Sequence, residues 1–389
     1  MNALNVVITG IGAVTPLKPF KGMDTFWNAL CSGEDAVKKE KPPLLGIDME
    51  WPMAKIDLSG FSNSTNPVDK LQIIAEEALR MATEDAELHN HSNIGLSIGT
   101  ILGNVLVKEN EMMLGQKPSA GSSLSNITSH LSGKFNLQGP EITVSTACAS
   151  GTDAIGIAMR KIMAEGIPIM IAGGVEVLSN FALTGFHALK VLTEEKVRPF
   201  DKSRSGIALG EGAAFVVLES EEHAVQRKAK IYGRVLGYTS RVDANNLTAP
   251  DREGRGLADA INQSILQANL KPHDIDYINA HGTGTLYNDL METKAIKKIF
   301  GKSAHDVPIS STKSMLGHSL GAAGVIEAIC CLLSIKNKII PPTINFREKD
   351  PECDLDYVPN IARFHKVKTA MSFSAGFGGQ NSAVILGKI

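Results

Sequence analysis

Short runs of apolar and β-branched residues alternate along the chain with longer segments whose apolar side chains recur every three or four positions. Residues 4–10, 94–99 and 167–174 are typical of buried strands, whereas residues 68–87 and 105–113 have helical spacing. The later residues predict strands at 231–239, 275–280, 307–311, 368–374 and 382–388, and helices at 255–268, 289–300 and 319–335. This alternation predicts an α/β fold with a mainly parallel sheet and helices on its faces.

Two stretches interrupt this alternation. Residues 38–67 are rich in Lys, Pro, Gly, Ser and Asn, and we expect irregular surface structure there. The charged stretch from Glu219 to Lys230 predicts a solvated helix and a link. We therefore expect one compact unit over residues 1–389, divided into an N-terminal half, 1–225, and a C-terminal half, 226–389.

Cys148 lies where a strand-like segment, Ile142–Val144, changes into an almost uncharged helical segment that ends at Arg160. A helix that is apolar on all sides is normally buried. The unpaired N–H groups and the dipole at its start would face the sulfur and lower the pKa of the thiol. Cys148 is therefore a candidate nucleophile. The alternative is an inert structural cysteine, because free cysteines are usually buried.

Two histidines occupy similar positions. His281 follows a predicted strand and enters a Gly/Thr loop, and His318 precedes a long apolar helix. The spacing from His318 to Gly321 equals that from Cys148 to Gly151. We interpret this as an internal duplication, in which each half places a reactive group at the start of its central helix.

Composition narrows the functional classes. The net charge is −2, with 43% hydrophobic and 21% charged residues, so no basic field for nucleic acid is expected. No uninterrupted apolar run reaches the roughly 18 residues that span a membrane, and no signal peptide is expected. Gly10 and Gly12 lack the third glycine of a dinucleotide-binding motif, since Thr15 stands there. We therefore expect no bound NAD or FAD.

The cysteines have no metal-binding or disulfide pattern. The five are Cys31, Cys148, Cys330, Cys331 and Cys353, with no C-x-x-C pair and no zinc spacing. We therefore expect no metal, a reducing compartment and a cytoplasmic location.

Four motifs occur in a fixed order: VSTACASGTDAIG, NAHGTGT followed by NDxxE, STKSMLGHSLGAAGxxE and AGFGGQN. Together they resemble the β-ketoacyl-acyl-carrier-protein synthases, of the elongating type with a Cys-His-His triad. The resemblance extends from Val6 to Asn381 and implies a thiolase-like fold with duplicated α/β halves in a layered α-β-α-β-α architecture.

The resemblance implies a decarboxylative Claisen condensation in fatty-acid or polyketide and polyene chain elongation. Cys148 would carry an acyl group as a thioester, since a thiolate is both a good nucleophile and a good leaving group. Malonyl-acyl carrier protein would lose CO₂, and Nε2–H donors of His281 and His318 would stabilise the enolate. Backbone N–H groups at Cys148 and near Phe377 would stabilise the later oxyanion. The enzyme class implied is an acyltransferase.

Further residues match supporting positions of this family. Lys313 would polarise the catalytic network and Glu327 would be its buried acidic partner, since an isolated carboxylate inside an apolar helix is costly unless paired. Asp289 and Glu292 are expected to cap and pair the helix after the first histidine.

The substrate-binding residues come from the same comparison. Thr283 and Thr285 match threonines that bind the phosphopantetheine arm, Phe377 matches a gating phenylalanine and Phe186 borders the acyl pocket. Turn formation alone could also explain the glycine-rich loops. No cofactor is implied beyond the phosphopantetheine that acyl carrier protein brings.

The chain also departs from the family pattern. Ala375 stands where a phenylalanine is frequent, and the loop from Leu192 to Arg198 is short. Basic residues are few between positions 60 and 80, which leaves Lys70, Lys117 and Lys190 as candidates for carrier docking. These differences favour specialised metabolism.

Other identities fit the residues less well. An initiating synthase would carry Asn in place of His318, and a thiolase would carry a second catalytic cysteine near its C-terminus. A non-catalytic chain-length factor would lack Cys148. The expected partners are acyl carrier protein and a second subunit, in a homodimer or in a heterodimer with a related ketosynthase or chain-length-factor subunit. The edge near Ile142–Ser145 is the expected contact.

Overall fold

The computed structural model describes residues 5–18, 20–42, 50–59, 61, 69–88, 93–119 and 123–389. Within these ranges, ten strands form one continuous sheet in the order β11-β10-β14-β15-β9-β1-β8-β6-β4-β5. The first five in chain order are β1 (Val6–Val14), β4 (Ile94–Gly99), β5 (Glu141–Val144), β6 (Ile169–Glu176) and β8 (Gly212–Ser220). The other five are β9 (Gly233–Val242), β10 (Tyr277–Asn279), β11 (Ile309–Ser310), β14 (Thr369–Gly376) and β15 (Gln380–Gly387).

The sheet has an internal symmetry. The five strands of each half are numbered here in chain order, starting from β1 in one half and from β9 in the other. From the edge of the sheet to its centre, both halves then have the order third, second, fourth, fifth, first. The two first strands, β1 and β9, pair with each other. The predicted duplication of an α/β unit is therefore confirmed. The boundary at residues 225 and 226 stays a prediction; α7 (Glu221–Gln226) lies there and is followed by β9.

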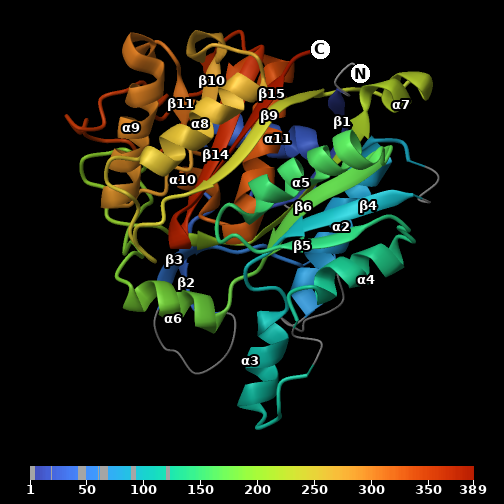
Figure 1. The fold of residues 1–389 in the computed structure, drawn as a ribbon. Helices are drawn as coiled ribbons and strands as arrows, with labels where there is room; N and C mark the ends of the chain where they lie inside the picture. The colour runs from blue at the N-terminus through green and yellow to red at the C-terminus, as the bar shows by residue number, and fades with distance from the viewer. Residues whose placement is uncertain are drawn as a thin grey trace.

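The two central helices lie between the halves of the sheet (Figure 1). They are α5 (Ser150–Glu165) and α11 (Ala323–Asn337), which contact each other. Their side chains share one apolar core with Ala214, Val216 and Leu218 of β8. The alternate β8 residues Ala213, Phe215 and Val217 face a second core, because successive side chains of a strand point to opposite faces.

Outer helices complete the layers. The second core is covered by α2 (Lys70–Asp85) and α4 (Asn126–Lys134), and a third by α8 (Arg255–Gln267) and α9 (Leu286–Phe300). The result is the predicted α-β-α-β-α order. Smaller elements are α1 (Met23–Ser32), α3 (Val105–Met113), α6 (Asn180–Ala188), α10 (Lys313–Leu316), β2 (Lys38–Glu40), β3 (Trp51–Ala54), β7 (Leu209–Gly210), β12 (Ile339–Ile340) and β13 (Arg363–Phe364).

Two predictions about the strands are wrong. The sheet is mixed rather than mainly parallel: β4 pairs parallel with β5 and β6, and β10 with β11 and β14, but every pairing from β6 through β1 and β9 to β14 is antiparallel. The stretch 38–67 is not wholly irregular, because β2 and β3 form a small sheet with β7. Positions 43–49, 60 and 62–67 of that stretch lie outside the described residues.

Among the residues that the structure describes, one segment has the length and composition of a membrane span. This segment is Leu320–Asn337, and Glu327 and Lys336 interrupt its apolar run. The segment comprises α11 and the 3-10 turn before it, and 89% of it is buried inside the protein. Its apolar composition is that of a central helix enclosed by the two halves of the sheet.

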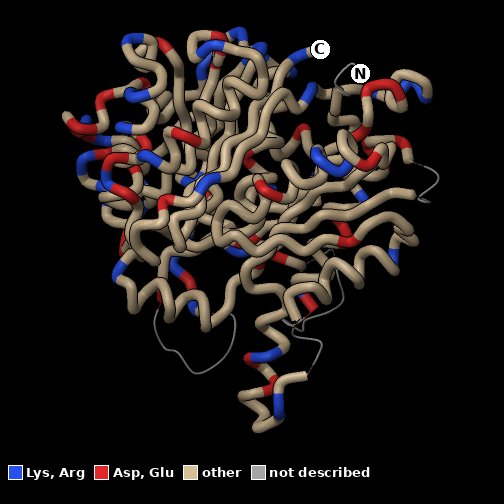
Figure 2. The backbone as a smooth tube through the Cα atoms, in the orientation of Figure 1, with Lys and Arg blue, Asp and Glu red and all other residues tan. Residues whose placement is uncertain are grey.

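Charged residues of both signs alternate over the periphery in the view of Figure 2, and neither sign dominates one side. This distribution agrees with the net charge of −2.

Candidate active site

Cys148 lies in a tight turn between β5 and α5. Ala147, just before it, has φ 50°, a left-handed conformation that costs a non-glycine residue about 1–2 kcal/mol. Gly99 permits the close packing beneath the turn, since a Cβ there would lie 2.4 Å from the carbonyl carbon of Ser150. The thiol is 7% exposed, and the turn directs it toward the C-terminal half.

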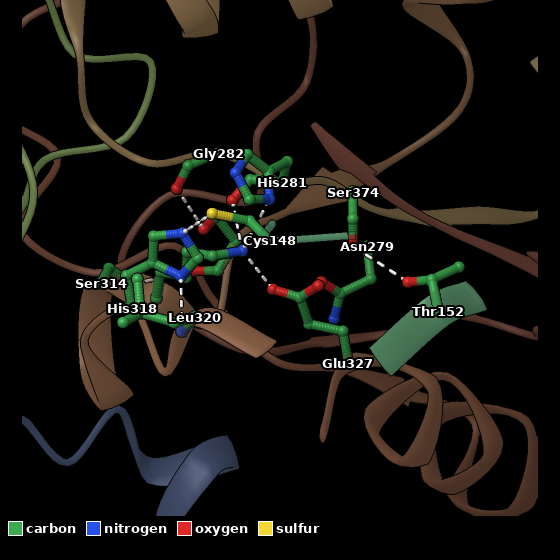
Figure 3. A network of polar contacts seen from close by, with 12 residues as sticks. Cys148, Thr152, Asn279, His281, Gly282, Ser314, His318, Leu320, Glu327 and Ser374 are labelled. Atoms are coloured by element: carbon green, nitrogen blue, oxygen red, sulfur yellow. Dashed lines mark hydrogen bonds and ion pairs between the residues drawn. The ribbon is translucent and has the colours of Figure 1, made fainter. Parts of the chain in front are cut away.

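His318 reaches Cys148 from the turn after α10. Its Nε2 lies 3.1 Å from the sulfur of Cys148, and the backbone N–H of Leu320 donates to its Nδ1 at 3.2 Å (Figure 3). Because Nδ1 accepts this hydrogen bond, the neutral ring carries its proton on Nε2. His318 is thus oriented as an Nε2–H donor toward the nucleophile.

His281 follows β10 and lies beside His318, with ring centroids 5.1 Å apart. Lys313 Nζ lies 3.2 Å from His281 Nδ1 and donates to the His281 carbonyl oxygen at 2.7 Å. The ammonium group has no acceptor atom, so Nδ1 of His281 accepts and Nε2 carries the proton. Lys313 also pairs with Glu327 in α11, as the sequence predicts.

Burial controls the protonation of this site. Desolvation lowers the pKa of both imidazoles well below its ordinary value, and the positive charge of Lys313 acts in the same direction. Both rings are therefore neutral at neutral pH. Burial raises the pKa of Glu327 to about 7, while its pairing with Lys313 pulls it down.

The expected lowering of the Cys148 pKa is wrong. Burial raises the pKa of this thiol to about 12, against the opposing effect of Lys313, and the negative charges of Glu176 and Glu327 raise it further. The resting side chain is thus a neutral thiol. Its proton must leave as the sulfur attacks.

Asp289 and Glu292 do not cap α9. Asp289 accepts from the backbone N–H of Phe200 at 2.7 Å, and Glu292 accepts from that of Gly282 at 2.8 Å. The two buried carboxylates fix the loop after His281 instead, and burial raises the pKa of both.

A cavity of about 530 Å³ opens above the triad. Cys148, His281 and His318 line it together with all four predicted substrate-binding residues, Thr283, Thr285, Phe186 and Phe377. The rings of Phe186 and Phe377 stack with centroids 5.6 Å apart, and the hydroxyls of Thr283 and Thr285 lie 3.0 Å apart. The cavity therefore brings together every residue that the sequence singled out for substrate contact.

The candidate docking lysines differ in availability. Lys70 forms an ion pair with Glu211 and its side chain is only 13% exposed, so it is not presented for docking. Lys190 is exposed at the cavity and Lys117 is exposed beyond α3. The docking role of these two stays a prediction.

Cys148, His281 and His318 also have potential ligand atoms within 4.8 Å of one another. Zinc sites use such residues. Here, however, each Nδ1 accepts a hydrogen bond and each Nε2 carries a proton, which leaves the rings as donors. The arrangement is better suited to stabilising a negative oxygen.

Sequence reasoning missed two acidic residues at the site. Asp243 lines the cavity and accepts from Asn381 Nδ2 at 2.8 Å, and Glu176 lies buried at the end of β6. Glu176 could have been noticed as a single charge that ends an apolar strand. Asp243 lies in a loop without apolar periodicity, so no pattern marks it.

Two family models match the chain: "Beta-ketoacyl synthase, N-terminal domain" over residues 4–224 and "Beta-ketoacyl synthase, C-terminal domain" over residues 232–347. The 3-oxoacyl-[acyl-carrier-protein] synthase 2 of Coxiella burnetii is 38% identical, with 100% of both chains covered. The tetracenomycin polyketide synthase ketoacyl synthase alpha subunit of Streptomyces glaucescens is 36% identical, with 98% of this chain and 97% of the relative covered.

Solved structures are similar over the full length. The ishigamide ketosynthase/chain length factor has a TM-score of 0.90 at 32% identity, with 100% of both chains covered. A type II polyketide acyl-carrier protein in complex with its ketosynthase bound to the hexaketide gives the same TM-score at 31% identity, also with 100% of both chains covered.

Proposed function

The chain belongs to the β-ketoacyl synthase family, and we propose that it condenses an acyl group on Cys148 with malonyl-acyl carrier protein to give β-ketoacyl-acyl carrier protein. One geometric feature carries this proposal: two neutral imidazoles are held as Nε2–H donors beside a buried thiol at the bottom of a cavity. Elongation of fatty-acid or polyketide chains is the setting that the related proteins suggest.

The first half-reaction transfers the acyl group. The sulfur of Cys148 attacks the thioester carbonyl of acyl carrier protein, a new C–S bond forms and the old one breaks. The proton of the Cys148 thiol goes to the departing phosphopantetheine sulfur. His318 cannot take this proton at Nε2, which already carries one, so its donated hydrogen bond stabilises negative charge on the Cys148 sulfur during attack.

The second half-reaction forms the carbon–carbon bond. The malonyl thioester loses CO₂, and the electron pair of the broken bond passes into an enolate whose oxygen accepts from Nε2–H of His281 and His318. The enolate carbon then attacks the Cys148 thioester. Backbone N–H groups of Cys148 and Phe377 are proposed donors to the oxyanion; a Cβ on Gly376 would lie 2.9 Å from the Cys148 nitrogen, so the two segments are adjacent. The Cys148 thiolate leaves and takes a proton from the solvent.

Substrate delivery and assembly follow from the same proposal. Thr283 and Thr285 would bind the phosphopantetheine arm, Phe377 would gate the cavity and Phe186 would border the acyl chain. Acyl carrier protein is the proposed partner, together with a second subunit that is a copy of this chain or a related chain-length factor. We also propose a cytoplasmic location, since all five cysteines are unpaired and a thiol nucleophile requires a reducing compartment.

Intact-protein mass spectrometry after incubation with acyl-acyl carrier protein tests the nucleophile. We expect one acyl group on the wild type and none on Cys148→Ala, a small change that leaves the fold intact. Cys31→Ala is the matched control, because Cys31 is a half-buried cysteine outside the cavity, and it should acylate normally. Product formation by Cys148→Ala at the wild-type rate would contradict the proposal.

A further inference from the structure

Glu176 is a fully buried carboxylate that no step above uses. It ends β6, is 0% exposed and accepts hydrogen bonds from four groups. These are the Thr100 hydroxyl at 2.6 Å, the backbone N–H of Ile101 and of Leu102 at 3.1 Å each, and the backbone N–H of Gly321 at 3.3 Å. In the described part of the chain no Lys, Arg or His forms an ion pair with it. Only hydrogen-bond donors compensate its burial.

These donors belong to two segments that lie beside the catalytic residues. Ile101 and Leu102 pack against the apolar cluster that contains Cys148, Leu178 and Leu320. Gly321 follows Leu320, whose N–H sets the tautomer of His318 (Figure 3). One carboxylate thus connects the segment packed beside the nucleophile with the turn that orients His318.

The hydrogen bond from Gly321 to Glu176 connects the two duplicated halves. Within the sheet, Glu176 of β6 corresponds to Gly376 of β14, since each ends the fourth strand of its half. Gly376 packs against Cys148 at the start of the N-terminal central helix, and Glu176 binds Gly321 at the start of the C-terminal one. A Cβ on Gly321 would lie 2.9 Å from Thr100 Cα, so the contact is close on both sides.

We propose that Glu176 is a positioning residue for the condensation, which holds residues 100–102 to the turn at Leu320–Gly321 and thereby fixes His318 as an Nε2–H donor. This inference rests on the proposed function. The electrostatics agree with it: burial raises the pKa of Glu176 to about 7, and the four donors pull that pKa down because they favour the ionised form.

Glu176→Gln is the informative variant. Oε1 accepts from the N–H of Leu102 and Oε2 from that of Gly321, so in either orientation the amide NH₂ of glutamine faces a backbone donor and one connection is lost. The matched control is Glu219→Gln. Glu219 of β8 is also 0% exposed, but in the strand register it lies opposite Ile169, which is at the other end of β6 from Glu176 and away from Cys148. Glu176→Asp is a second variant that keeps the charge, should the glutamine variant fail to fold.

The readouts separate positioning from general stability. We expect Glu176→Gln to slow decarboxylation of malonyl-acyl carrier protein roughly 100-fold with little change in KM, and to slow acylation of Cys148 far less. Glu219→Gln should leave both rates within about twofold of the wild type. In ¹⁵N spectra of the imidazoles, His318 should lose its single Nε2–H tautomer in Glu176→Gln and recover it in Glu176→Asp.

Wild-type rates in both half-reactions for Glu176→Gln would overturn the inference, as would an equal loss in both with an unchanged His318 spectrum. Failure of the wild type itself to acylate Cys148 would instead reject the proposed function. The two failures are therefore distinguishable.

Discussion

Lys313 is the charged residue that adds to the effect of burial on the protonation of the site. Its Nζ contacts His281 and pairs with Glu327, and all three side chains are buried. Burial lowers the pKa of His281 and His318 most, and the positive charge of Lys313 lowers it further, because a neighbouring cation disfavours the imidazolium. The same charge lowers the pKa of the Cys148 thiol against the larger effect of burial.

Lys313→Met should therefore shift the pH dependence in a defined direction. Loss of the charge raises the pKa of both histidines toward about 6.5, so the acid limb of malonyl decarboxylation should move to higher pH. It also raises the pKa of Cys148, so alkylation by iodoacetamide at about pH 8 should slow. Rate profiles between about pH 5 and pH 9 measure the first effect. An acid limb that stays in place or moves down would contradict this account.

The two histidines should act mainly on one half-reaction. His281→Ala or His318→Ala removes a donor to the enolate oxygen, and loss of one such donor typically costs 10²–10³-fold, so we expect about that loss in decarboxylation. Acylation of Cys148 should be less affected. Radiolabelled CO₂ release and mass spectrometry follow the two steps separately. Lost acylation with intact decarboxylation is the result that this division of roles does not allow.

Ala375 should set the shape of the cavity next to the thioester. It lines the cavity and packs against the outer core under α8 and α9, which contains Met371 and Phe373. Ala375→Phe should shift preference toward a saturated acyl chain and away from a polyunsaturated chain of equal length. The comparison is kcat/KM for the two carrier-bound substrates, and an unchanged ratio excludes Ala375 as a specificity determinant.

At the scale of elements, α5 can pack between the halves of the sheet only because of a glycine. A Cβ on Gly156 would lie 2.1 Å from the ring of Tyr238 in β9, and the Tyr238 hydroxyl donates to Asp153 of the same helix at 2.7 Å. Gly156→Ala should therefore destabilise the fold by about 1–3 kcal/mol through overpacking. Urea unfolding measures this as a lower midpoint.

Gly133→Ala in α4 is the matched control. No atom lies within 4 Å of the Cβ it would add, and the position is helical, so alanine should stabilise by about 0.5–1 kcal/mol. A destabilised control, or a Gly156→Ala variant as stable as the wild type, would show that helix contacts do not limit the packing of α5.

The sequence predicts where the strands and helices lie better than it predicts whether neighbouring strands are parallel or antiparallel. Apolar runs located nearly every strand of the large sheet, and residues 105–113 match α3 in both bounds. The antiparallel pairing of the fourth, fifth and first strands could not be read, because strands buried on both faces give continuous apolar runs in either direction. Cys148, His281 and His318 were predictable since each marks the junction of two elements. Glu176 acts through backbone groups of two distant segments, and no local pattern encodes that.

At the scale of the whole molecule, the sheet ends in an edge that the described chain leaves uncovered. β5 is the last strand, with Glu141 exposed and Ile142 and Thr143 half-buried. Elsewhere, α3 extends away from the body (Figure 1), and Met112 and Leu114 at its end are 62% and 64% exposed. Exposed edges promote pairing with another chain. We expect a second subunit, identical or related, to cover β5.

Thr143→Pro tests this edge. Leu96 N–H donates to the Pro140 carbonyl and Thr100 N–H to the Val144 carbonyl, so the even-numbered residues of β5 face β4 and Thr143 directs its N–H outward. Proline there removes a donor from the free edge only.

Light scattering at micromolar concentration should give twice 41.5 kDa for the wild type and less for Thr143→Pro. Thr143→Val keeps the N–H and loses only the hydroxyl contact with Thr128, so it should remain dimeric. A wild type that is monomeric alone but pairs with a co-expressed related subunit supports the heterodimer, whereas a monomer under both conditions contradicts the assembly.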